Sequence, residues 1–89
     1  MARFVLWGTY CENALEMRTP FRAQHLDRLD TFKKQGVLIT LGPTNCNTQV
    51  FGIFEAKSIE IVRQLIEEDV YWKEKIWTDF EIYPWTQAF

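Results

Sequence analysis

The order of strand-like and helix-like segments constrains the fold of this 89-residue chain more than any other feature. Alternating, β-branched and aromatic runs predict four strands, and helical stripes with start and stop signals predict two helices. In chain order we expect a strand over Arg3–Tyr10, a helix from Pro20 to Gln35, strands over Val37–Leu41 and Gln49–Ala56, a helix after Ser58, and a strand over Ile76–Tyr83. This β-α-β-β-α-β order predicts an α+β, ferredoxin-like fold, in which an antiparallel sheet carries two helices on one face.

Local signals predict where the two helices begin and end. Thr19 is expected to cap the first helix, with Pro20 at its first position, and Gly36 is expected to end it. Ser58 is expected to cap the second helix, because an apolar stripe with helical spacing follows it.

Two prolines predict where two of the strands end. Gly42-Pro43 has the composition of a turn, and Pro84 is expected to end the last strand. Alternation along that last strand places Ile76 and Phe80 on one face and Trp77 on the other.

Length and composition indicate one globular domain over residues 1–89. A hydrophobic fraction of 47% with a net charge of −2 argues against disorder and against a general binder of nucleic-acid phosphates. No apolar run reaches the roughly 18 residues that span a bilayer, and the first residues have no long apolar stretch followed by a small-residue cleavage site, so we expect no secretory signal. Cys11 and Cys46 are too few for a disulfide framework, so we expect two reduced thiols in a cytoplasmic protein.

The predicted strands are apolar on both faces. In the first strand Phe4 and Leu6 alternate with Val5 and Trp7, and the chain carries four tryptophans. Two helices cover only one face of a sheet, which leaves an apolar patch larger than monomers usually expose. We therefore expect a homodimer that packs sheet against sheet.

The chemistry of the chain centres on its single histidine. His25 lies on the first helix, with Arg22 three residues and Arg18 seven residues before it. These spacings bring all three to one helical face if the helix or a preceding turn reaches Arg18, which lies just outside the expected start. Two guanidinium groups attract a carboxylate or enolate and favour the neutral base form of the imidazole by charge repulsion. The alternative is a surface histidine, with the two arginines in solvated ion pairs to Glu16 or Asp27.

Asp69 and Gly42-Pro43 are the other candidate site positions. Asp69 follows two glutamates at the expected end of the second helix, where the helix dipole disfavours a carboxylate, so a local role such as orienting His25 is one interpretation. The alternative is a solvated acidic run. Gly42-Pro43 is either a plain turn or the edge of a pocket. No zinc spacing, phosphate loop or nucleotide fingerprint is present, so neither a metal nor a cofactor is expected.

An ordered set of short segments resembles the YCII-related (YciI-like) family. Its segments are Ala14–Arg18 followed by Arg22–Leu26 with Leu29, then Gly36–Leu38 with Gly42-Pro43, Phe54–Ser58, Asp69-Val70-Tyr71 and Ile82–Trp85. The resemblance covers nearly the whole chain in the right order. It implies a dimeric α/β-barrel type of ferredoxin-like fold and a His–Asp pair in a cleft.

The resemblance carries these roles to His25 and Asp69 as the pair, with Arg22, Arg18, Gly42, Pro43 and Tyr71 as positions that bind substrate. It also implies lyase-like or isomerase-like chemistry, since relatives include dehydrochlorinases that act on a muconate-type ring-cleavage product.

Three functions therefore compete. The first is a cofactor-independent enzyme in which His25 and Asp69 move a proton on a small acidic metabolite held by the arginines. The second is a dimeric module that binds such a molecule without chemistry. The third is RNA binding, since RNA-recognition domains share the β-α-β-β-α-β order, but the basic residues of their aromatic strand motif are missing.

Overall fold

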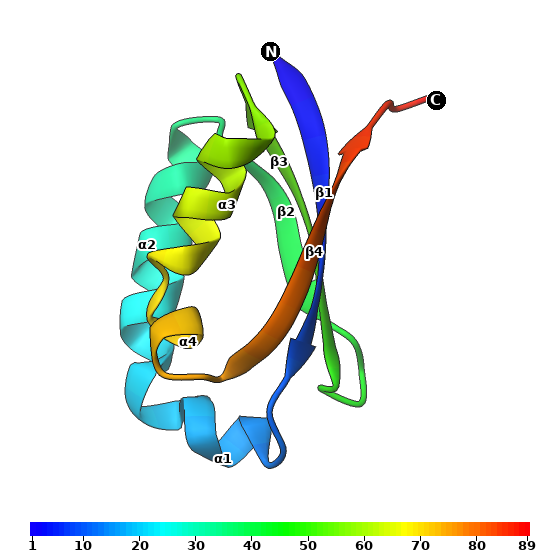
Figure 1. Cartoon of the computed structure of the whole chain (residues 1–89). Coiled ribbons are helices and arrows are strands. Elements are labelled where there is room, and N and C mark those ends of the chain that lie inside the picture. Colours follow the sequence, from blue (N-terminus) through cyan, green and yellow to red (C-terminus); the bar gives the residue numbers. More distant parts are fainter.

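The computed structural model describes residues 1–89 and has two layers, a four-stranded antiparallel sheet and a layer of helices on one of its faces (Figure 1). The strands are β1 (Ala2–Tyr10), β2 (Leu38–Pro43), β3 (Gln49–Ala56) and β4 (Trp77–Trp85). The helical segments are α1 (Ala14–Arg18), a 3-10 turn over Thr19–Phe21, α2 (Arg22–Lys34), α3 (Ile59–Glu67) and α4 (Val70–Lys73). The α+β, ferredoxin-like fold class predicted from the sequence is confirmed.

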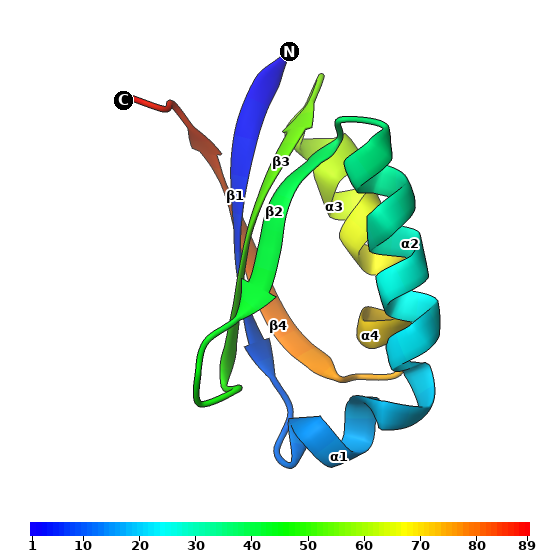
Figure 2. The same cartoon turned by 180° about the vertical axis from the view of Figure 1, so that it is seen from behind.

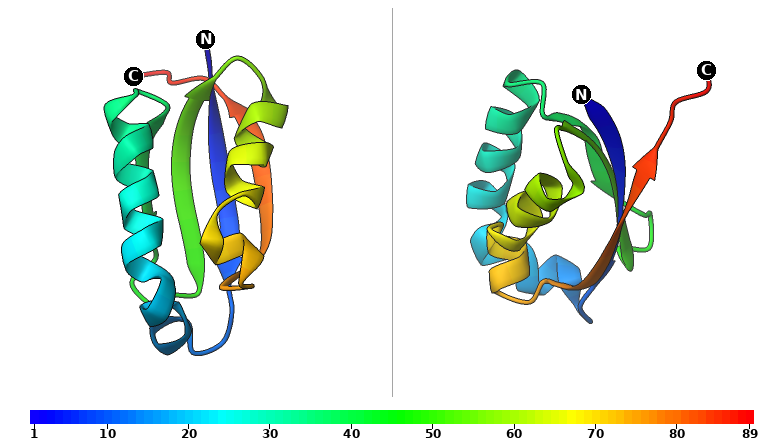
Figure 3. Two further views of the ribbon diagram at one scale, coloured as in Figure 1. Left: turned by 90° about the vertical axis from the view of Figure 1, so that its left-hand side faces the viewer. Right: turned by 45° about the horizontal axis from the view of Figure 1, so that its top comes forward.

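The strand order in the sheet is β2-β3-β1-β4, so β1 and β3 are central and β2 and β4 are the edges. Every neighbouring pair of strands is antiparallel. The edge strand β2 runs alongside α2 (Figure 2), and α3 lies on the same face of the sheet against β3 and β4 (Figure 3). The short α1 lies at the end of the molecule where β1 leaves the sheet (Figure 1).

The core lies between the inner face of the sheet and the helices. Alternation along the two central strands sends every second side chain inward, because successive side chains of a strand point to opposite faces. Buried contributors include Phe4, Leu6, Val50 and Phe54 from the sheet and Val62 and Ile66 from α3.

Two of the predicted helix boundaries are confirmed. Gly36 ends α2 with a positive φ of 78°. Its own N–H donates to the carbonyl of Lys33 and the N–H of Val37 donates to that of Phe32, as in a Schellman motif. Ser58 caps α3, since its hydroxyl oxygen accepts from the N–H of Ile61 at 3.4 Å.

The predicted start of the first helix is wrong. The chain is already helical from Ala14, and Thr19 has a helical φ of −51°, so it lacks the extended backbone that a capping residue needs. Its hydroxyl instead donates to the carbonyl of Leu15 at 2.8 Å. Pro20 lies in the 3-10 turn, and α2 begins only at Arg22.

One of the two proline signals ends a strand. Gly42 and Pro43 are the last two residues of β2, with Pro43 opposite Val50, so this strand runs two residues past Leu41 and ends at the proline. Pro84 instead lies inside β4, opposite Phe4. Both strands are edges of the sheet, where proline is tolerated because one side of the strand has no neighbouring strand to receive a hydrogen bond. The turn comes later, over the residues between Pro43 and Gln49.

The expected face of Trp77 is also wrong. Ile76 and Trp77 are both buried, at 1% and 2% exposure, although they are neighbours in the chain. The pairing of β1 with β4 shifts between Thr9 and Tyr10, and this irregularity turns Trp77 inward opposite Tyr10.

The outer face of the sheet carries exposed aromatic side chains. Trp7 is 41% exposed, Phe51 40%, Tyr83 49% and Trp85 37%. They come from β1, β3 and β4, and no helix covers this face (Figure 1). Among the helices, none has the length and apolar character needed to cross a membrane.

Candidate active site

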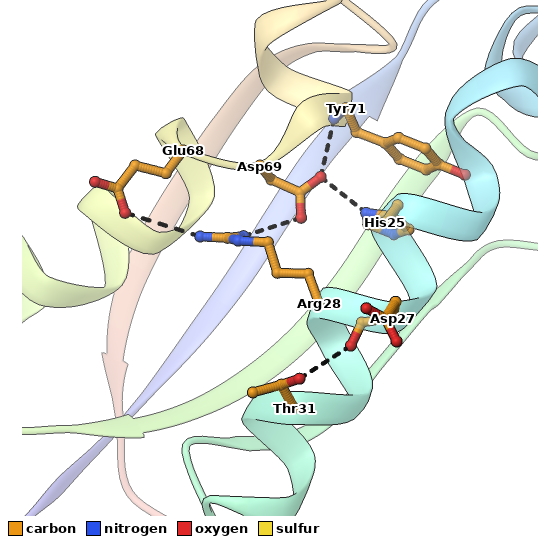
Figure 4. A network of polar contacts seen from close by, with 7 residues as sticks. All are labelled: His25, Asp27, Arg28, Thr31, Glu68, Asp69 and Tyr71. Atoms are coloured by element: carbon orange, nitrogen blue, oxygen red, sulfur yellow. Dashed lines mark hydrogen bonds and ion pairs between the residues drawn. The ribbon is translucent and has the colours of Figure 1, made fainter.

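His25 is the one fully buried side chain of α2, with 3% exposure. It meets Asp69, which is 1% exposed and lies 44 residues further along the chain. The Nδ1 atom of His25 lies 2.8 Å from Oδ1 of Asp69 (Figure 4). The convergence of these two side chains, which the sequence predicts, is therefore found in the structure.

Local backbone structure explains why Asp69 is in this place. Helix α3 ends at Glu67, and Asp69 has extended dihedrals, φ −72° and ψ 141°, as the capping residue of α4. Its Oδ1 accepts from the backbone N–H of Tyr71 at 2.9 Å. The expected position at a helix C-terminus is thus wrong, because Asp69 begins the next helix, where the dipole favours a carboxylate.

Aromatic rings fix the orientation of the imidazole. The ring of His25 stacks on that of Tyr71 with centroids 3.6 Å apart and planes 7° from parallel. Trp77 stands nearly perpendicular beside both rings, at 5.2 Å from His25 and 5.5 Å from Tyr71. This packing restricts rotation of the imidazole and keeps Nδ1 directed at Asp69.

A cavity of about 100 Å³ opens beside the histidine. It collects six of the seven residues proposed from the sequence, namely His25, Arg18, Arg22, Gly42, Pro43 and Tyr71. Tyr10, Leu26, Leu29 and Leu41 complete its wall. Asp69 does not line the cavity but bonds His25 from the other side.

Several polar groups at this cavity have no partner within the protein. Nε2 of His25 and the hydroxyl of Tyr71 form no hydrogen bond, although both side chains are buried. No carboxylate lies within 4.0 Å of Arg18 or Arg22, so the alternative ion pairs with Glu16 or Asp27 do not form. These free donors and acceptors are available to a molecule in the cavity.

The two arginines act electrostatically on Tyr71. Burial raises the pKa of the Tyr71 hydroxyl, and the positive charges of Arg18 and Arg22 partly offset that effect. The hydroxyl is therefore a neutral hydrogen-bond donor at neutral pH, beside two cations.

Sequence reasoning missed one charged contact of this site. A guanidinium nitrogen of Arg28 donates to Oδ2 of Asp69 at 3.0 Å (Figure 4). Arg28 also lies 3.9 Å from Glu68 and 4.6 Å from the centre of the Phe32 ring. A signal was present, because Arg28 follows His25 by three residues and so lies on a neighbouring face of the same helix.

Larger hollows lie elsewhere but lack this combination of groups. The largest, about 540 Å³, is lined by Glu67, Trp72, Lys73, Lys75, Trp77 and Thr78. No group of three or more histidine, cysteine, aspartate or glutamate side chains is placed to hold a metal ion.

Comparison with known proteins agrees with the family resemblance. The family model of the YCII-related domain matches residues 2–86. No curated protein sequence matches the chain.

Solved structures share the fold. The structure of 5-chloro-2-hydroxyhydroquinone dehydrochlorinase (TftG) from Burkholderia phenoliruptrix, in complex with 2,5-dihydroxybenzoquinone, has a TM-score of 0.83 and 23% identity, and the match covers 97% of this chain and 95% of that one. A protein from Agrobacterium tumefaciens has a TM-score of 0.62 and 11% identity, over 99% and 94% of the two chains. SnoaB, a cofactor-independent oxygenase from Streptomyces nogalater, has a TM-score of 0.53 and 14% identity, over 98% and 92%.

Proposed function

This chain belongs to the family of YCII-related domains, and on that premise we propose that it is a cofactor-independent enzyme whose His25–Asp69 pair carries out acid–base chemistry on a small acidic molecule. The observation that carries the proposal is the 2.8 Å contact between the imidazole and a buried carboxylate, with the second ring nitrogen left free at a cavity.

His25 is the proposed base. Its Nε2 takes a proton from a carbon next to a carbonyl group, and Asp69 orients the ring and stabilises the imidazolium that forms. Such acid–base catalysis contributes about 10²–10⁴-fold to a rate.

Arg18 and Arg22 are the proposed anion-binding groups. Their unpaired guanidinium groups hold the acidic group of the substrate, and with the hydroxyl of Tyr71 they stabilise negative charge that develops as the proton leaves. Gly42 and Pro43 form the edge of the cavity on the β2 side. At about 100 Å³ the cavity is smaller than the roughly 300–1,000 Å³ of typical ligand pockets, so the proposed substrate is a small molecule.

The proposed reaction class is a lyase or isomerase reaction, with dehydrochlorination as one form. In that form His25 takes the proton, the electron pair of the C–H bond forms a double bond, and chloride leaves from the neighbouring carbon. The dehydrochlorinase that shares this fold supports the choice. Its name specifies a chlorinated hydroquinone, an intact ring, whereas the sequence resemblance suggested a ring-cleavage product.

A panel of small carboxylic acids and hydroxyquinones tests the proposal, with binding followed by calorimetry and turnover by absorbance. We expect His25→Ala to lower turnover at least 100-fold while binding persists, and Arg22→Ala to weaken binding. Gln24→Ala, on the exposed side of α2, is the matched control. A ligand that binds the unaltered protein but is never turned over would instead favour the binding module.

A second copy of the chain is the proposed partner, packed against the exposed aromatic face of Trp7, Phe51, Tyr83 and Trp85. Sedimentation at micromolar concentration tests this. We expect a dimer that Trp7→Lys dissociates, whereas Leu15→Lys, an equally drastic change at an exposed position of α1, leaves the dimer intact. A monomer of the unaltered protein would refute the dimer.

The cytoplasm, where Cys11 and Cys46 stay reduced, is the proposed location.

A further inference from the structure

The two oxygens of Asp69 have different partners. Oδ1 accepts from Nδ1 of His25 and from the backbone N–H of Tyr71, at 2.8 and 2.9 Å. Oδ2 accepts from the guanidinium of Arg28 at 3.0 Å. Arg28 is the only permanently charged cation within salt-bridge distance of this buried carboxylate.

The guanidinium of Arg28 is held in place from several sides. Its side chain leaves α2 one turn after His25 and crosses to the junction of α3 and α4 (Figure 4). The centre of the Phe32 ring lies 4.6 Å from Cζ of Arg28, and Oε1 of Glu68 lies 3.9 Å from Nη2. Only 25% of the Arg28 side chain is exposed. A contact with so many supports persists better than a surface ion pair.

We propose that Arg28 is a positioning residue that keeps the charge on Asp69 and thereby keeps His25 neutral, with its proton on Nδ1 and its free lone pair on Nε2 at the cavity. This inference rests on the proposed function, in which Nε2 is the base. The cation beside Oδ2 disfavours transfer of the Nδ1 proton to the carboxylate, because it stabilises the ionised acid. It also balances the carboxylate charge, so that an imidazolium is not needed as the counter-ion.

Two other cations and two tyrosines also face the imidazole, and none of them favours its protonated form. Arg22 on α2 and Arg18 on α1 line the cavity with His25, and their charges also disfavour an imidazolium. Tyr10 of β1 and Tyr71 of α4 also line it. Only Arg28 contacts the carboxylate itself, so its removal changes the charge balance of the pair directly.

Nitrogen NMR of the imidazole tests the inference without any substrate. The chain has one histidine, so the signals of its two ring nitrogens need no assignment to a residue. We expect the unaltered protein at neutral pH to show a protonated Nδ1 and an unprotonated Nε2. Arg28→Met keeps the aliphatic packing on Phe32 but removes the charge. It is expected to raise the ratio of imidazolium to imidazole at neutral pH about tenfold, because the carboxylate loses its other counter-ion.

Two further variants separate charge from packing. Arg28→Lys keeps the charge and is expected to restore most of the original titration. Arg63→Met removes an arginine that also lies over a phenylalanine, Phe80, at 5.7 Å, and is expected to leave the titration unchanged. If Arg28→Met is poorly folded by circular dichroism, the comparison of Arg28→Lys with Arg28→Gln takes its place.

The outcomes separate this inference from the proposed function. An Arg28→Met titration equal to that of the unaltered protein, or a proton on Nε2 rather than Nδ1 in the unaltered protein, would overturn the positioning role. If the NMR spectra show the expected proton on Nδ1 and the expected effect of Arg28→Met, but no tested compound is turned over, the proposed enzyme would be refuted while the role of Arg28 stays intact.

Discussion

Replacement of Asp69 is expected to destabilise the fold more than any other single loss of a carboxylate. Asp69 is 1% exposed and is bonded by an imidazole, a guanidinium and a backbone N–H. Removing one partner of a buried ionic pair costs about 3–5 kcal/mol, because the remaining groups stay buried without a partner. Since Arg28 is 25% exposed and water can solvate it, we expect Asp69→Ala to lie at the lower end of that range.

Asp69→Asn separates the charge from the helix cap. Asparagine caps a helix as well as aspartate does, so it can still accept from the N–H of Tyr71. Its amide has only one oxygen, so when that oxygen accepts from Tyr71 and His25 the NH2 group faces the Arg28 guanidinium donor to donor, and the contact with Arg28 is lost. A hydrogen bond to a charged group contributes about 1.5–3 kcal/mol. The expected loss for Asp69→Asn is therefore about 2 kcal/mol, and the loss for Asp69→Ala is larger.

Urea unfolding followed by tryptophan fluorescence measures both losses, at one fixed protein concentration because a dimer would add a concentration dependence. Asp27→Asn and Asp27→Ala are the matched controls, since the carboxylate of Asp27 on α2 is exposed and forms no ion pair. They are expected to change the free energy of unfolding by less than about 0.5 kcal/mol. Equal effects at both positions would show that the buried pair contributes nothing to stability.

Two further predictions concern other parts of the chain. Hydrogen bonds from Thr44 and Thr48 lower the pKa of the exposed Cys46 thiol to about 7, so its rate of alkylation by iodoacetamide should rise as the pH increases through 7. Thr48→Val should move this rise to higher pH. A midpoint of the alkylation rate above about pH 8.5 in the unaltered protein would contradict the lowered pKa. Gly8→Ala should lower the free energy of unfolding in urea by about 1–3 kcal/mol, because the added methyl group would lie 2.9 Å from a side-chain carbon of β3. In Gly42→Ala the methyl group meets nothing within 4 Å, so stability should stay nearly unchanged. Similar losses for the two variants would refute this packing argument.

Local sequence signals predicted the elements of the fold well. Apolar alternation predicted β3 at Gln49–Ala56 with the observed bounds, and Gly36 and Ser58 ended and began their helices as expected. These signals work because they depend on dihedral preferences and on the period of side chains, which are set within a few residues. The family resemblance also singled out the residues that line the cavity.

Signals that depend on context failed. Pro84 was expected to end a strand, but it lies inside the edge strand β4, where a missing N–H is tolerated. Trp77 turned inward through an irregular pairing of β1 with β4, which no period along β4 alone can indicate.

The sequence by itself determined the order of the elements, the single imidazole, and the place of Arg22 on the same helix. Only the tertiary structure decided what the imidazole touches. Asp69 and His25 lie 44 residues apart, so their 2.8 Å contact depends on how α2 packs beside the α3–α4 junction. The contact of Arg28 with the pair also depends on tertiary structure. In the sequence Arg28 looks like an ordinary surface residue of a helix, and only folding brings a buried carboxylate to its guanidinium.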